Sequence, residues 1–355
     1  MNTNENHCFR LPAEWEPQSG IILIWPHEDT DWRPYLNEIT EVYLQMADAI
    51  TRFEPLLITV HDTEKVHSLL AERLTEGQMK RVTLFACDNN DTWARDVAPI
   101  SLVSDKDPKG SLQALRLLDF CFNGWGEKFA AEKDNRINRQ LYEAGLLQGV
   151  LENHKDFVLE GGSIESDGDR TLFTTMGCLM APHRNQPLTQ EEIDKRLRLF
   201  FPNVERVVWL DYGQLAGDDT DGHIDTIVRV APNHTLLYIG CDDKEDEHYE
   251  DFRLLEEQLK QLRTLEGEPY RLLRLPMPDA IYDDGERLPA THANFLIING
   301  AVLVPTYNQP EKDKVALDTI QEAFPDREII GIDSRTIIRQ HGSIHCLTMQ
   351  LPLNG

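Results

Sequence analysis

The sequence of 355 residues predicts an α/β fold in which five similar units close around a centre. The first observation is a repeated unit, because an amphipathic helix, an aliphatic strand and a polar elbow recur at intervals of roughly 55–60 residues. The second is that further apolar strands adjoin these units, which indicates mixed sheets. The third is that no linker or low-complexity stretch divides the chain. Although length alone suggests about two domains of ~150 residues, we therefore expect one domain spanning residues 1–355.

The elements of the five units follow in chain order. Hydrophobic residues at helical spacing predict the helices, and short aliphatic runs that end at polar residues predict the strands. The expected helices cover residues 64–74, 127–148, 189–201, 245–262 and 312–324. The strands that follow them cover residues 81–86, 156–159, 206–210, 270–276 and 327–332. The polar elbows then cover residues 87–96, 160–163, 211–225, 277–286 and 333–346.

Two further features support this reading. Thr189 and Glu192 form a capping-box pattern at the start of the third helix. Additional strands are expected at residues 226–230, 235–240, 294–298 and 301–305. The alternative fold is an open doubly wound α/β sheet, which would also gather the elbows at the ends of its strands. Either fold therefore places the functional site in the elbows.

The composition restricts the classes of partner. Lys plus Arg number 35 and Asp plus Glu number 61, which gives a net charge of −26. Such a field repels nucleic acid and anionic lipid and favours small cations. The N-terminus lacks a basic start followed by an apolar run, no apolar stretch approaches the ~18 residues of a membrane span, and the six cysteines form no C-x-x-C motif. We expect a soluble, cytoplasmic protein with no nucleic-acid partner, no membrane partner and no cofactor; the sequence leaves a homo-oligomer open.

Two elbows place carboxylates at the ends of strands. "DTWARD" (91–96) brings Trp93 and Asp96 together, and a carboxylate beside an aromatic wall suits a cation with an apolar stem. A surface ion pair for Asp96 and a core position for Trp93 are the alternatives. "LEGGS" (159–163) puts Glu160 where the strand should still be buried, so this carboxylate needs a partner. The glycine pair that follows it predicts a tight turn.

The elbow "DDTDGHID" (218–225) combines carboxylates with a histidine. In an extended segment, His223 and Asp225 point to the same side, which is the usual arrangement of a general acid/base and its carboxylate. Histidine and aspartate also suit a divalent ion, so a metal-dependent hydrolase using His223, Asp225 and Asp221 is an alternative. A structural role for the histidine is a further alternative.

The last elbow ends in "GSIHC" (342–346). If residues 343–351 form a strand, His345 and Cys346 face opposite ways and are not an acid/base pair, so we assign His345 a packing or supporting role. Cys346 is a buried inert thiol or, if it meets His223 across the centre, a thiolate nucleophile. Carboxylates that bind no metal would then bind a cation such as a guanidinium, whose N–H groups can form two parallel hydrogen bonds to one carboxylate.

Six motifs occur in an order that identifies a family: "LPAEWEPQSGIILIWP" (11–26), "NDTWARDVAPI" (90–100), "LEGGS" with the following "TLFTT", "DDTDGHID", "THANFLIINGAVLVPTYN" (291–308) and "SIHCLTMQLP" (343–352). From about residue 9 to its C-terminus, the chain resembles the agmatine deiminase family. This family includes bacterial-type peptidylarginine deiminases and belongs to the guanidino-group-modifying superfamily. The resemblance implies a five-bladed, pseudo-symmetric β/α propeller of the pentein type, and metal-free hydrolysis of a guanidinium to a ureido group.

The resemblance also implies roles for the residues in these motifs. Cys346 would be the nucleophile and His223 the general acid/base. Asp96 and Asp225 would bind the guanidinium, and Glu160 would orient His223 or share its charge. Each of these five residues lies in one of the quoted motifs.

Two more residues complete the expected substrate site, since the resemblance implies that Trp93 and Asp219 line the stem and the amine end of the substrate. We therefore expect hydrolysis of agmatine to N-carbamoylputrescine and ammonia through a covalent thioether on Cys346. The main alternative is a peptidylarginine deiminase, which performs the same chemistry in an open cleft. A metal-dependent hydrolase and a non-enzymatic binder of polyamines or guanidines are the others.

Two positions depart from the family pattern. The family usually has a run of glycines and an asparagine before I-H-C, whereas this chain reads Gln340, His341, Gly342 and Ser343. Arg170 stands in "DGDRT" where a glycine is usual, and we expect a surface turn there.

Overall fold

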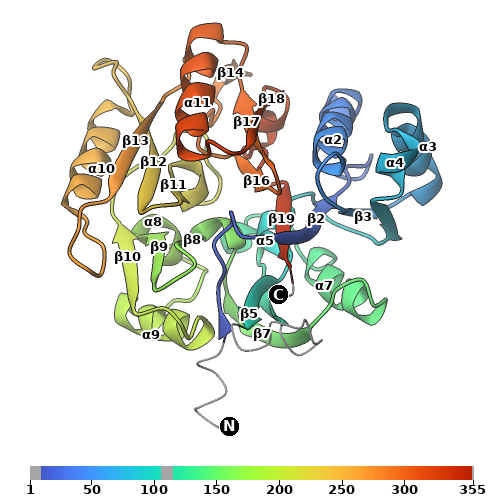
Figure 1. Cartoon of the computed structure of the whole chain (residues 1–355), viewed down its shortest axis with the longest axis horizontal. Coiled ribbons are helices and arrows are strands. Elements are labelled where there is room, and N and C mark those ends of the chain that lie inside the picture. Colours follow the sequence, from blue (N-terminus) through green and yellow to red (C-terminus); the bar gives the residue numbers. More distant parts are fainter. Residues whose placement is uncertain (1–8, 105–114, 354–355) are drawn as a thin grey trace.

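The computed structural model describes residues 9–104 and 115–353. Within these residues, the strands form five sheets of three or four strands and one two-stranded hairpin. The sheets lie around the middle of the molecule, and the longer helices lie outside them (Figure 1). The predicted α/β content is confirmed, and the five separate sheets rule out the alternative of one open doubly wound sheet.

One strand pairing is repeated in all five sheets. An antiparallel pair leads into a parallel pair, and a helix connects the two parallel strands, since parallel neighbours need a crossover connection. The connected units are β2 (Gln18–Ile24), α2 (Leu36–Thr51) and β3 (Leu56–Val60); β6 (Leu115–Cys121), α7 (Asp134–Glu143) and β7 (Val150–Val158); β9 (Thr171–Thr175), α9 (Gln190–Phe200) and β10 (Arg206–Leu210); β12 (Thr235–Gly240), α10 (Tyr249–Gln261) and β13 (Arg271–Pro276); β17 (Ala301–Thr306), α11 (Pro310–Ala323) and β18 (Glu328–Asp333).

The remaining strands complete these sheets. The antiparallel partners of the five units are β19 (Thr348–Pro352), β5 (Ile100–Ser104), β8 (Ile164–Ser166), β11 (Val228–Ala231) and β16 (Leu296–Ile298). Two sheets have a fourth strand, namely β1 (Phe9–Arg10) and β4 (Val82–Ala86), and β4 follows α3 (Thr63–Arg73) and α4 (Glu76–Met79). The hairpin consists of β14 (Tyr282–Asp283) and β15 (Glu286–Arg287). Because β19 pairs with β2, the last strand shares a sheet with the second strand of the chain, whereas β1 pairs with β5 in another sheet.

Most predicted elements occur within a few residues of their expected bounds. The capping box at α9 is confirmed, because Thr189 accepts a hydrogen bond from the Glu192 backbone and the Glu192 side chain accepts one from the Thr189 backbone. The helix expected over 127–148 is shorter, since α7 covers only Asp134–Glu143. Before it, α6 (Gly124–Glu127) contains Trp125 and Gly126 at φ 55° and 87°, which regular helix does not allow. Arg170 lies in an exposed turn, as expected, and pairs with Glu266.

The strand predicted over residues 343–351 is wrong at its start. β19 begins at Thr348, and residues 344–347 form a turn in which the Leu347 N–H donates to the Ser343 carbonyl at 3.2 Å. Strand alternation therefore does not separate His345 from Cys346. Both side chains instead approach the same carboxylate oxygen of Asp225, at 2.7 Å and 3.6 Å respectively.

The inner strands carry the core and hold the elbows in place. β3, β9 and β12 are buried along their whole length, which matches their aliphatic sequences.

Across residues 9–104 and 115–353, no helix combines the length and the apolar character that a membrane crossing needs.

Candidate active site

Cys346 lies in the turn before β19 and is 4% exposed. Asn294, which immediately precedes the strand region of β16, holds this turn with both atoms of its amide. Its Oδ1 accepts hydrogen bonds from the backbone N–H groups of His345 and Cys346 at 3.0 Å and 3.3 Å. Its Nδ2 donates to the Cys346 sulfur at 3.2 Å. A donor aimed at the sulfur stabilises the thiolate form.

Carboxylates control the protonation of this thiol. The Cys346 thiol donates to Asp225 Oδ2 at 3.6 Å. Burial raises the pKa of Cys346 well above its usual value, and the Asp225 and Asp96 carboxylates raise this pKa further. The surroundings therefore favour a neutral thiol until a cation lies beside these carboxylates and offsets their charge.

Three of the predicted catalytic residues converge on Gly162. His223 Nδ1 lies 3.7 Å from Asp96 Oδ1, and the Gly162 N–H donates to the same oxygen at 3.0 Å. A Cβ atom on Gly162 would lie 2.6 Å from His223 Nδ1 and 3.0 Å from one oxygen each of Asp225 and Asp96. His223 precedes a short 3₁₀ helix, η3 (Ile224–Thr226), rather than lying in an extended segment. The close approach therefore depends on glycine at position 162.

His223 is held as a potential acid. Its ring is fully buried, and neither ring nitrogen has a hydrogen-bond partner within the described part of the chain. Burial lowers the pKa of His223, but the Asp96 carboxylate, Cys178 and Asp225 together raise this pKa well above its usual value. The imidazolium form is therefore favoured, and this is the form that donates a proton to a leaving group.

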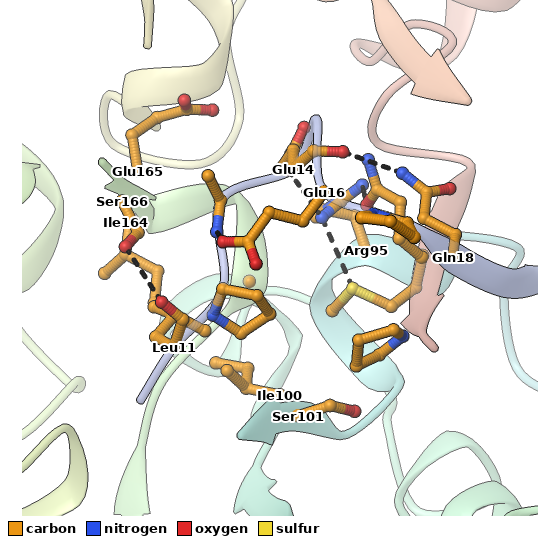
Figure 2. A pocket seen from close by; sticks show the side chains of 17 residues that line it. Leu11, Glu14, Glu16, Gln18, Arg95, Ile100, Ser101, Ile164, Glu165 and Ser166 are labelled. Carbon is orange, nitrogen blue, oxygen red and sulfur yellow. Dashed lines mark hydrogen bonds and ion pairs between the residues drawn. The ribbon is translucent and has the colours of Figure 1, made fainter. Parts of the chain in front are cut away.

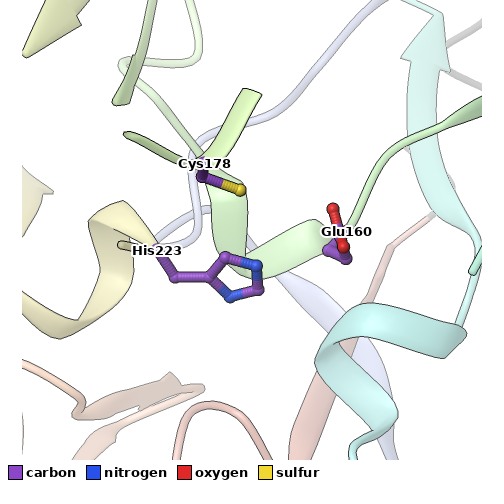
Figure 3. Close-up of side chains that lie close together, drawn as sticks. All are labelled: Glu160, Cys178 and His223. Atoms are coloured by element: carbon purple, nitrogen blue, oxygen red, sulfur yellow. The ribbon is translucent and has the colours of Figure 1, made fainter. Parts of the chain in front are cut away.

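Glu160 lies beside His223 and Cys178, as Figure 3 shows. One Glu160 oxygen, the Cys178 sulfur and one His223 ring nitrogen lie within 4.8 Å of one another. Arg184 Nε approaches Glu160 Oε1 at 2.8 Å as an ion pair without hydrogen-bond geometry, and both side chains are fully buried. Arg184 is thus the partner that a buried carboxylate at position 160 requires.

The metal-site alternative with Asp221 is not formed. In the residues described, the clusters that could hold an ion are Glu160–Cys178–His223 and Glu14–Glu165–His345. Asp221 belongs to neither cluster. Its carboxylate instead accepts hydrogen bonds from Lys128 at 2.8 Å and from Arg184 at 2.7 Å. In the first cluster, a divalent ion would have to compete with the buried Arg184 guanidinium for the Glu160 carboxylate.

A cavity with about 570 Å³ of empty space reaches Cys346 and Asp96. Trp93 and Trp125 form an aromatic wall, with ring centroids 6.4 Å apart in an edge-to-face arrangement. Trp125 Nε1 also donates to Asp96 Oδ2 at 3.0 Å, which fixes this carboxylate. The predicted Asp219 lines the same cavity with a side chain that is 41% exposed. An aromatic wall between carboxylates suits a cation with an apolar stem.

The other lining residues bring further acid to this cavity. Asp31 and Asp91 both line it. His223 and Asp225 do not, but each contacts a lining residue, since His223 approaches Asp96 and Asp225 approaches Cys346. All seven predicted site residues therefore belong to one region. Asp96 is buried at 5% exposure, so the alternative of a surface ion pair is wrong.

Sequence reasoning missed four residues that hold these groups, namely Asn294, Trp125, Cys178 and Arg184. Asn294 had a usable signal, because it is an amide directly before the apolar run of residues 295–298. Trp125 stands between two glycines after a strand, which also suggests a special turn. Cys178 and Arg184 had no local signal, since they lie outside the elbows and their partner Glu160 is distant from them in sequence.

The arrangement provides the parts of nucleophilic catalysis. A buried thiol, an acidic histidine and two ionisable carboxylates lie beside a cavity with an aromatic wall. A thiolate can attack an electrophilic carbon in the cavity while the histidine protonates the group that leaves. The carboxylates favour an electrophile that carries positive charge.

Substitution of Gly162 by alanine is expected to lower kcat/KM about 100-fold, because the new methyl group displaces His223 and both neighbouring carboxylates. Gly77 in α4 is the matched control, since the nearest atom to an added Cβ there is 3.9 Å away. Steady-state kinetics and thermal unfolding of both variants check the prediction. Equal kcat/KM values for Gly162→Ala and Gly77→Ala would contradict the proposed packing.

Comparison with known proteins finds relatives along the whole chain. The family described as Porphyromonas-type peptidyl-arginine deiminase matches residues 10–352. An agmatine deiminase of Pseudomonas aeruginosa is 32% identical, and the alignment covers 97% of this chain and 95% of that protein. A cysteine-to-serine variant of the C. jejuni agmatine deiminase with substrate bound is 35% identical with a TM-score of 0.88, covering 98% and 97% of the two chains. A Porphyromonas gingivalis structure, provisionally named an arginine deiminase, is 47% identical with a TM-score of 0.90, covering 98% and 99%.

Proposed function

The chain belongs to the Porphyromonas-type peptidyl-arginine deiminase family, and we propose that within it the protein acts as an agmatine deiminase. The observation that carries this proposal is a buried thiol and two carboxylates at the end of a cavity that is walled by tryptophan and lined by further carboxylates. Agmatine has a guanidinium at one end, an apolar stem and an amine at the other end. Its two charges and its stem match the two acidic regions and the aromatic wall.

The reaction begins when Asp96 and Asp225 bind the guanidinium. Its positive charge offsets the carboxylates that raise the pKa of Cys346, so the thiol releases its proton to solvent and the thiolate forms beside its electrophile. The thiolate forms a bond to the central guanidinium carbon and gives a tetrahedral adduct. His223 protonates one nitrogen, ammonia leaves, and an amidino thioether remains on Cys346.

The second half of the reaction releases the product. His223, now neutral, takes a proton from a water molecule, and the resulting hydroxide adds to the thioether carbon. The carbon–sulfur bond then breaks, its electron pair restores the Cys346 thiolate, and the hydroxyl group of the adduct loses its proton to solvent as the product carbonyl forms. The product is N-carbamoylputrescine, in which an oxygen has replaced one guanidinium nitrogen. Glu160, which is paired with Arg184, lies next to His223 and keeps it in position. Neither Glu160 nor Arg184 lines the cavity that would hold the substrate.

The peptidyl-arginine alternative differs only in what the cavity must admit. Cys346 is 4% exposed, so a side chain that reaches it must pass the tryptophan wall. Near the exposed Asp219, agmatine presents an amine, whereas peptidyl-arginine presents uncharged backbone. The lining carboxylates Asp31 and Asp219 therefore favour agmatine.

The architecture fits this role. We propose that the five units form a pseudo-symmetric five-bladed propeller of the pentein type in one domain, because every sheet repeats the same pairing. A reducing, cytoplasmic location is supported by the five described cysteines, which are all free.

The test compares ammonia release from agmatine, free arginine and an arginine-containing peptide by the same purified protein. The expected kcat/KM is highest for agmatine. A higher kcat/KM for the peptide, measured as citrulline, would assign the peptidyl-arginine activity instead. Ammonia release from none of the three would contradict both activities.

Replacement of Asp219 by asparagine tests the amine end of the site. We expect KM for agmatine to rise about 5- to 10-fold with little change in kcat, because a partly exposed charge contributes uniform binding. Asp318→Asn is the matched control, since Asp318 is an exposed carboxylate on α11 paired with Lys314 outside the cavity. An unchanged KM in Asp219→Asn would place the amine elsewhere.

A further inference from the structure

His345 is buried between two carboxylates. Its Nδ1 lies 2.7 Å from Asp225 Oδ2, and its Nε2 lies 2.8 Å from Glu14 Oε1. The ring is fully buried. Because each ring nitrogen faces an acceptor, only the imidazolium, which has two N–H donors, satisfies both contacts. Removal of either contact would leave a buried polar group without a partner.

Two arginines hold the Glu14 carboxylate in addition to His345. Arg95 Nη1 donates to the same Glu14 oxygen at 3.0 Å, and Arg229 Nη2 donates to the other oxygen at 2.5 Å. Arg229 is itself fully buried and pairs with Glu165. Figure 2 shows Glu14 and Arg95 at the wall of a second cavity. Residues that precede β2 line this cavity, whereas Cys346 and Asp96 do not. The segment before β2 thus anchors the outer end of this chain of contacts.

Asp225 receives the inner end. Its Oδ2 accepts from His345 and from the Cys346 thiol, whereas its Oδ1 is buried without a hydrogen-bond partner in the described residues. An unpartnered buried carboxylate oxygen is costly. The contact with His345 therefore fixes the carboxylate plane so that one oxygen serves the thiol and the other stays available for a guanidinium N–H.

We propose that Glu14, His345 and Asp225 form a relay, in which His345 is a positioning residue for the substrate-binding carboxylate. The proposal rests on the proposed function, because Asp225 is assigned there to the guanidinium. It adds a role for the segment before β2, because Glu14 contacts His345 although the two residues are 331 positions apart in the chain. The relay predicts that the donor at Nδ1 matters more for catalysis than the donor at Nε2.

The charged groups around the relay set the expected pH response. Asp225 is faced by His345 and the Cys346 thiol from the turn before β19, by His223 from its own elbow, by Arg229 from β11 and by Asp96 from the elbow 87–96. Burial raises the pKa of Asp225, but the hydrogen bond and the charge of His345, together with the charges of His223 and Arg229, lower it, so that the net shift is downward. His345 is also near Glu165. Loss of the imidazolium therefore raises the pKa of Asp225, and the acidic limb of the kcat/KM profile moves to higher pH.

Two variants separate the donors of His345. In His345→Asn the amide nitrogen takes the place of Nδ1, and in His345→Gln the longer amide takes the place of Nε2. At the pH of maximal activity, we expect kcat/KM for agmatine to stay within about 10-fold of the wild type in His345→Asn and to fall about 100-fold in His345→Gln. Both variants should move the acidic limb upward, because both lose the imidazolium charge.

Changes at the outer end complete the test. Glu14→Gln should lower kcat/KM, and the Glu14→Gln/His345→Gln double variant should lose little more than His345→Gln alone, because Glu14 acts on Asp225 only through the Nδ1 donor that His345→Gln has already lost. Glu16→Gln is the matched control, since Glu16 lines the same second cavity but pairs with Arg10. Thermal unfolding confirms that each variant is folded.

The results distinguish failure of the relay from failure of the proposed function. If the wild type releases no ammonia from agmatine, the proposed function fails. If the wild type is active and the two His345 variants are equally active with unchanged pH profiles, or if Glu14 and His345 lose activity additively, the relay is overturned.

Discussion

Replacement of Cys346 by serine is expected to lower kcat for agmatine by at least about 10⁴-fold, because a hydroxyl does not replace the thiolate as nucleophile and leaving group. Binding of agmatine should remain, since Asp96, Asp225 and the tryptophan wall are unchanged. Ammonia release measures the loss, and calorimetric titration with agmatine measures the binding.

Cys241→Ser is the matched control for this variant. Cys241 is also buried, and its thiol donates to the Asp243 carbonyl at 3.6 Å. Neither residue lines the cavity that reaches Cys346. Its kcat should be that of the wild type. A Cys346→Ser variant that retains more than about a tenth of the wild-type kcat would require another nucleophile.

Replacement of His223 by glutamine should lower kcat about 10³-fold, because the variant has no group that can protonate ammonia and then accept a proton from water. The amide keeps much of the ring's volume, so Asp96 and Gly162 should stay in place. The covalent intermediate, if it forms, should persist longer than in the wild type, since the water step needs a base.

His154→Gln provides the comparison for this second variant. His154 lies on β7, where its Nε2 approaches Glu152 Oε2 at 3.3 Å, and it lines no part of the cavity. Stopped-flow measurement of ammonia release should show normal turnover for it. A similar kcat in both histidine variants would remove His223 from the mechanism.

The repeated units could be predicted from the sequence because their signals are local. Aliphatic runs such as residues 206–210 and the capping box at Thr189 depend on neighbouring residues only. The elbows could also be assigned to one site, since repeats around a centre bring equivalent segments together. The short irregular turns could not be predicted, and Trp125 at φ 55° is an example in which tertiary contacts decide the backbone.

The contacts within the site depended on geometry that a single sequence does not contain. Strand alternation was the wrong rule for "HC" in the last elbow, because the turn before β19 directs both side chains to Asp225. The glycine pair predicted a turn, but the need for glycine at position 162 comes from His223 and two carboxylates that are distant in sequence. Arg184 was missed for the same reason, since an ion pair between residues that are distant in sequence leaves no local pattern.

The proposed mechanism requires that Cys346 carries the substrate covalently during deimination of agmatine. The most direct measurement is intact-protein and peptide mass spectrometry of the enzyme quenched in acid during turnover of agmatine. We expect an added mass of about 113 Da, which is agmatine less one ammonia, on the peptide that contains Cys346. Turnover with an unmodified Cys346 peptide, or an adduct on another residue, would contradict it.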